Sequence, residues 1–105
     1  MESDLADLPS VQYLRVRNDH PFAVQFSLEP WAEEITMPPK GILEVVAKGP
    51  QGDFLEVMLS DHRIAVYGWS GSIASVFDGR EKVINCQIPV PKTPTRPPRD
   101  TGKTC

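Results

Sequence analysis

The sequence has no long apolar run, only two cysteines and only two histidines among its 105 residues. None of its apolar runs approaches the roughly 18–20 residues that cross a bilayer, so we expect no membrane-spanning helix. Cys86 and Cys105 are too few for a disulfide framework, and Cys86 lies in an apolar strand-like run, where we expect a buried free thiol. The first ten residues have no basic segment followed by an apolar one. We therefore expect no signal peptide and a cytoplasmic location.

The chain also lacks a large excess of charge of one sign. Its formal net charge is −3, which is too small to indicate a nucleic acid or a membrane surface as a partner. Residues 1–8 carry acidic residues and no base, and the charged residues after Pro91 are mainly basic. Blocks of one sign at chain ends are usually solvated. We expect a flexible acidic segment at residues 1–10, a folded domain at residues 11–88 and a proline-rich basic tail, extended or disordered, at residues 89–105.

A helical periodicity is missing as well. No 3.6-residue apolar repeat persists for ten residues without a proline or a glycine, whereas alternation is common. Val24, Phe26 and Leu28 alternate with polar residues, which is typical of a half-buried strand. Similar runs predict strands over residues 11–17, 23–29, 34–37, 42–47, 54–60, 63–69, 73–77 and 82–88. Several of these runs are apolar on both faces, which favours positions in the middle of a sheet.

Turn residues separate the predicted strands at short intervals. They occur at residues 18–21, 38–41, 49–53, 60–63 and 78–79. The last of these is an Asp-Gly pair between two β-rich runs, which is typical of a hairpin. Seven or eight short strands at this spacing predict an all-β fold. We expect a single antiparallel β-sandwich, immunoglobulin-like or cupredoxin-like, or a partly closed barrel.

The stretch YGWSGS, residues 67–72, is the closest match to a catalytic motif. The nucleophile elbow of hydrolases needs G-x-S-x-G on a strand-to-helix turn. Here Ser72 occupies the position of the second glycine, and the following residues predict another strand. We therefore interpret Ser70 as part of a hairpin loop in which Gly71 is free to adopt a positive φ. We expect no enzyme activity and no cofactor.

The two histidines each follow an aspartate, as Asp19-His20 and Asp61-His62. Two such pairs could together bind zinc or copper. The alternative function is therefore a small metal-binding protein or a metal-dependent enzyme, which requires His20 and His62 to converge. Both pairs fall in predicted turns, however, where aspartate is common because its side chain hydrogen-bonds the backbone two residues on.

Aromatic residues provide the first candidates for a binding site. Alternation places Tyr67 and Trp69 on one face of a predicted strand, and Trp31 follows a proline that marks the end of another. Aromatic side chains at such a rim either bind a ligand or a partner, or close the end of the core. The sequence leaves these two interpretations open.

The tail provides the second candidates. Pro94, Pro97 and Arg99 fit the P-x-x-P-x-R pattern that Src-homology-3 grooves favour, although a semi-rigid spacer has the same composition. A sandwich also has edge strands whose backbone groups can accept a partner strand. The sequence therefore predicts a non-catalytic module that binds another protein or itself, with neither nucleic acid nor membrane as a partner.

Five short stretches carry a resemblance to known proteins. They are NDHPFAVQF at residues 18–26, LEPW at 28–31, MPPKG at 37–41, VYGWSGS at 66–72 and VFDG at 76–79. With them, residues 11–84 resemble a group of small uncharacterised bacterial all-β proteins. The resemblance implies a β-sandwich and no assigned function. The copper loop of cupredoxins is not matched, because neither His nor Met follows Cys86.

Overall fold

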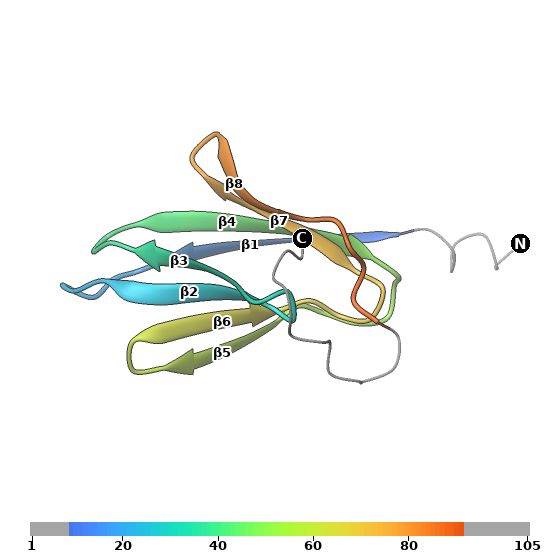
Figure 1. The fold of residues 1–105 in the computed structure, drawn as a ribbon, viewed down its shortest axis with the longest axis horizontal. Coiled ribbons are helices and arrows are strands. Elements are labelled where there is room, and N and C mark those ends of the chain that lie inside the picture. The colour runs from blue at the N-terminus through green and yellow to red at the C-terminus, as the bar shows by residue number, and fades with distance from the viewer. Residues whose placement is uncertain (1–8, 92–105) are drawn as a thin grey trace, which may run out of the picture.

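The computed structural model describes residues 9–91, which form eight strands and no helix (Figure 1). The first sheet contains, in spatial order, β1 (Ser10–Arg17), β4 (Ile42–Gly49), β7 (Ile73–Asp78) and β8 (Glu81–Cys86). The second sheet contains β3 (Glu33–Met37), β2 (Val24–Glu29), β6 (Arg63–Tyr67) and β5 (Glu56–Ser60). The predicted all-β fold is confirmed, and it consists of two separate sheets rather than a closed barrel.

All eight predicted strands are present, with ends within two residues of the predicted ones. Every strand pair is antiparallel except β2 and β6, which run parallel with Phe26 opposite Ile64. This one parallel pair departs from the antiparallel pairing that we expected within the sandwich. Between β2 and β6 the chain passes to the first sheet and returns, and such a crossover allows two strands to lie parallel.

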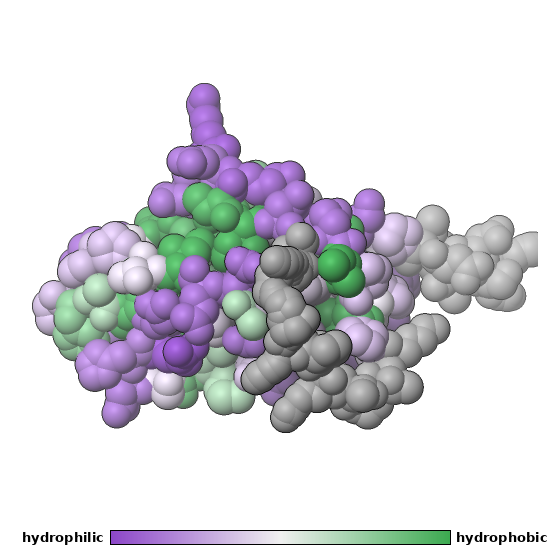
Figure 2. Space-filling model, viewed as in Figure 1, coloured by the Kyte–Doolittle hydropathy of each residue, from purple (hydrophilic) through white to green (hydrophobic). Residues whose placement is uncertain are grey.

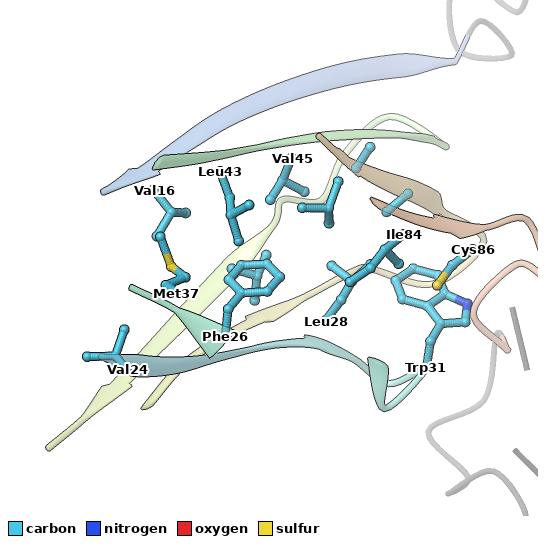
Figure 3. Packing of buried hydrophobic residues seen from close by; sticks show 14 of the residues in the cluster. Val16, Val24, Phe26, Leu28, Trp31, Met37, Leu43, Val45, Ile84 and Cys86 are labelled. Atoms are coloured by element: carbon cyan, nitrogen blue, oxygen red, sulfur yellow. The ribbon is translucent and has the colours of Figure 1, made fainter. Parts of the chain in front are cut away.

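The core lies between the sheets and is built from alternating side chains. Val24, Phe26 and Leu28 of β2 point inward, and β4 contributes Leu43 and Val45 from the opposite sheet (Figure 3). Burying an apolar side chain of this size stabilises a fold by about 1.5–3 kcal/mol. The two inner faces therefore supply the main driving force for folding.

A buried asparagine organises the connections at one end of the sandwich. The Nδ2 of Asn18 donates to the carbonyls of Phe22 at 2.9 Å and Pro38 at 3.0 Å. Its Oδ1 accepts from the amide of His20 at 3.0 Å, and its own amide donates to the carbonyl of Gly41 at 2.9 Å. One residue thus joins its own turn, residues 18–22, to the turn at residues 38–41.

The chain after β8 is fastened to the sandwich through Val90. The carbonyl of Val90 accepts from the amide of Gly71 at 2.8 Å, and its amide donates to the carbonyl of Ser72 at 3.0 Å. The side chain of Val90 packs against the core. The domain boundary predicted after residue 88 therefore falls two residues before this attachment point.

Cys86 is fully buried in β8, as expected, but it is disulfide-bonded rather than a free thiol. The expectation of a free thiol is therefore wrong. The other cysteine of the chain, Cys105, lies outside the described residues.

Candidate functional site

The two tryptophans close one end of the core. Trp31 is 9% exposed and Trp69 is 4% exposed. The indole Nε1 of Trp31 donates to the carbonyl of Ile88 at 2.7 Å, and that of Trp69 donates to the carbonyl of Pro50 at 2.7 Å. We call these four residues the tryptophan end. Both rings are buried, which is the arrangement that the core-lid interpretation expects.

Tyr67 does not share a face with Trp69. The inward side chains of β6 are Ile64 and Val66, which pack in or against the core. Alternation places Tyr67 on the outer face of the second sheet, where it is half-buried. The strand ends at Tyr67, so the predicted alternation does not continue to Trp69. The three predicted aromatic contact residues therefore form no common surface.

Ser70 lies in a tight turn, as predicted. The amide of Ser72 donates to the carbonyl of Trp69 at 2.8 Å, and the hydroxyl of Ser72 accepts from the Trp69 amide at 2.9 Å. Gly71 has a φ of +83°, the conformation that the third position of a type II turn requires. The turn is not a hairpin, however, because it leads from β6 in the second sheet to β7 in the first.

Both histidines contact the ring of Phe22. The ring centroids of His20 and Phe22 are 4.6 Å apart, and those of Phe22 and His62 are 4.9 Å apart. Asp19 forms an exposed ion pair with Lys40 at 3.5 Å rather than contacting a histidine. Residues 9–91 contain no group of three or more His, Cys, Asp or Glu side chains that could hold a metal ion.

The metal-site alternative, which uses Asp19, His20, Asp61 and His62, gains no support from this arrangement. Each imidazole ring packs against the ring of Phe22. The predicted tail contacts Pro94, Pro97 and Arg99 fall outside the described residues.

The strand β5 is unusual because all five of its residues are exposed. Leu59 is 72% exposed, and so is Phe54, which lies two residues before the strand. Val57 and Met58 are 43% and 54% exposed. We call these four residues the β5 edge. β5 is the last strand of the second sheet, so its outer side has no neighbouring strand among the described residues. Such an edge is a template for strand pairing.

Two of the other three edge strands, β3 and β8, carry more charged residues than β5. On the side of the molecule where β8 and β3 end the two sheets, Figure 2 shows a hydrophobic area between hydrophilic residues. The two edge strands there carry Glu33, Glu34, Glu81 and Lys82. Charged residues on an edge strand oppose pairing with another chain. β5 carries one charge, Glu56, at its first residue.

Gln12 of β1 holds the segment that leads into β5. Its Nε2 donates to the carbonyl of Asp53 at 2.8 Å, and its Oε1 accepts from the amide of Leu55 at 2.9 Å. The side-chain amide thus pairs with this backbone as a neighbouring strand would. Leu55 also packs against the core. The start of β5 is therefore fixed although the strand itself is exposed.

Polar side chains cover the outer face of the second sheet beside β5. Hydrogen bonds from Gln25 and Arg63 hold the pKa of the Glu34 carboxyl below its usual value. Burial raises the pKa of Glu29, and the negative charge of Glu34 adds to this shift. The contacts of Glu34 form an ordinary surface network, and β5 lies beyond it at the border of the sheet.

No protein-family model, no curated protein and no solved structure matches this chain. Within residues 9–91, no helix is long and apolar enough to cross a membrane.

Sequence reasoning missed the β5 edge. The run FLEVMLS is apolar on both faces, a pattern that favoured the middle of a sheet. The clamp by Gln12 was missed as well, because a glutamine within a strand gives no signal of a partner more than forty residues away.

Proposed function

We propose that the protein is a non-catalytic binding module that takes up an extended strand along β5, either from another protein or from a second copy of itself. The observation that carries the proposal is that β5 has all its residues exposed although three of its five are apolar. An added strand would form main-chain hydrogen bonds with the free side of β5 and cover these side chains. The proposal includes neither nucleic acid nor membrane as a partner.

The proposed contact lies on β5 and not at the tryptophans. Trp31 and Trp69 have their indole N–H groups bonded within the chain and their rings buried. A partner could reach them only by opening the end of the core. Val57, Met58 and Leu59 are accessible without any rearrangement.

Affinity capture from a lysate of the native host tests this function. Leu59→Lys places a charge on the proposed contact, because lysine on an edge strand opposes pairing. Val83→Lys, on the edge strand β8, is the matched control, since Val83 is also exposed. We expect the wild-type chain and Val83→Lys to retain the same bound protein, and Leu59→Lys to lose it. Equal capture by all three chains, or none by any, would contradict the proposal.

The cytoplasmic location is also a proposal, and the bonded state of Cys86 argues against it. Disulfides persist in oxidising compartments and are rare in the cytosol. Acid quenching of intact cells, then alkylation of thiols under denaturing conditions and peptide mass spectrometry, tests the location, because the fully buried Cys86 must be unfolded before a reagent can reach it. An alkylated Cys86 is expected in the cytoplasm, whereas Cys86 recovered in a disulfide would assign the protein to an oxidising compartment.

A further inference from the structure

We propose that the strand taken up along β5 is the β5 of a second copy of this chain, antiparallel and centred on Met58. The two second sheets then become one continuous sheet across a two-fold axis. This inference rests on the proposed function, because it names the partner of the same edge. It follows from the order of residues in β5, its charges and the way its start is held.

The sequence of β5 complements itself in this register. With Met58 opposite Met58 of the other copy, Val57 lies opposite Leu59 and Glu56 lies opposite Ser60. Val57 and Leu59 share the face of the inward residues, because they pair with Val66 and Ile64 of β6. The apolar pair therefore occurs twice, on the core side of the joined sheet. Apolar cross-strand pairs stabilise a sheet by roughly 0.2–1 kcal/mol each.

The charges favour the antiparallel arrangement over the parallel one. Glu56 is the only charged residue of β5. In a parallel, in-register pair it would lie beside Glu56 of the other copy, and like charges directly opposite destabilise a sheet. In the antiparallel pair it faces Ser60. No like charge therefore lies directly opposite Glu56 in this arrangement.

The edge is ready to accept a strand without refolding. Gln12 fixes the backbone of Asp53 and Leu55 through two hydrogen bonds. The hairpin to β6 fixes the other end, where Ser60 pairs with Arg63. An edge that is already ordered loses little conformational freedom when a second strand binds. Two copies of the same ordered edge satisfy this condition on both sides.

Sedimentation equilibrium of the full chain tests the oligomeric state. We expect the mass to rise with concentration from 11.7 kDa to twice that value. Leu59→Lys should stay at the monomer mass throughout, with unchanged circular dichroism, and Val83→Lys should behave as the wild type. A wild-type chain that stays monomeric, or a Leu59→Lys dimer as tight as the wild type, would overturn the inference.

Cysteine cross-linking tests the register. Directly opposite residues in an antiparallel pair have Cα atoms about 4.5–5.5 Å apart, which lies within the range that a disulfide spans. We expect Met58→Cys to cross-link to itself under mild oxidation, with the bond mapped by mass spectrometry. Val57→Cys should cross-link to Leu59→Cys when the two variants are mixed. The unmodified chain under the same oxidation is the control for Cys86 and Cys105.

The outcomes separate this inference from the proposed function. Efficient self-linking of Val57→Cys without linking of Met58→Cys would overturn the proposed register. A monomeric chain that still captures another protein through β5 would overturn the second copy as partner and leave the binding function standing. A monomeric chain whose capture is unaffected by Leu59→Lys would overturn both.

Discussion

Trp69 at the tryptophan end and Leu59 on the β5 edge are both large apolar residues. Trp69 is 4% exposed, whereas Leu59 is 72% exposed. At the tryptophan end, polar groups brought by distant segments cover the core, and each indole donates to a backbone carbonyl of such a segment. At β5 only the start of the strand is held in this way, by Gln12. A large apolar residue thus marks a contact surface only where the local backbone leaves it uncovered.

The comparison also separates stability from association. Removing a side chain at the tryptophan end should change the free energy of unfolding, because its contacts are internal. Changing the β5 edge should alter binding and leave the fold intact.

Trp69→Ala should have the largest effect. Removing a buried tryptophan ring costs about 3–5 kcal/mol, since it creates a cavity as well as losing burial. The carbonyl of Pro50 also loses its donor. Urea unfolding followed by circular dichroism measures the loss. Leu59→Ala is the control, and we expect it to lie within about 0.5 kcal/mol of the wild type. Equal effects of the two variants would contradict the contrast.

Gly49→Ala should be the next most destabilising variant. A Cβ on Gly49 would lie 2.7 Å from the Cα of Ser72, so the backbone beside the tryptophan end must move. Overpacking of this kind costs roughly 1–3 kcal/mol, whereas replacing glycine by alanine gains about 0.4–1 kcal/mol through the unfolded state. We expect a net loss in urea unfolding. Gln51→Ala should show none, because Gln51 is exposed in the turn that follows β4.

The sequence predicted the strands well because alternation depends on local burial. Val24, Phe26 and Leu28 each face the core as their spacing indicates. The Ser70–Gly71 turn was predicted too, since the positive φ of Gly71 is a local requirement. These features depend on residues close together in the chain.

The order of strands within the sheets was not predictable from the same patterns. An apolar run such as β5 fits a central strand or an exposed edge equally well, and only the crossovers between sheets decide which. The burial of Trp31 depends likewise on the carbonyl of Ile88, which lies 57 residues further along the chain. The candidate site therefore became visible only with the tertiary arrangement.

Glu29→Gln tests a polar residue close to the tryptophan end. Glu29 is the last residue of β2 and lies just before the turn to Trp31. Burial raises the pKa of Glu29 above its ordinary value of 4.5, so the folded state binds its proton more tightly than the unfolded state. The stability that Glu29 contributes by binding this proton is present at pH below 4.5 and is lost as the pH rises through the pKa of the folded state. We expect Glu29→Gln to raise the urea midpoint at neutral pH.

The same gain should disappear in acid, where Glu29 of the wild type is protonated and resembles glutamine. Midpoints measured at a series of pH values test the sign. Glu34→Gln is the contrasting control: hydrogen bonds lower the pKa of Glu34, so its substitution should not stabilise the protein at neutral pH. A gain from Glu29→Gln that persists in acid would contradict burial as its cause.

Leu59→Lys should have the smallest effect on the fold of the monomer. Its side chain is mostly in solvent, and substitutions at such positions usually change stability by less than about 0.5 kcal/mol. Unfolding measured where the wild type is monomeric should therefore give the same midpoint for both chains. At concentrations where β5 is paired, the wild type alone gains stability, because binding to the folded state adds to the free energy of unfolding. A midpoint difference between the two chains that grows with protein concentration would show that the substitution acts on association. A constant difference would place Leu59 in the core of the monomer, and Leu59 would then no longer differ from Trp69.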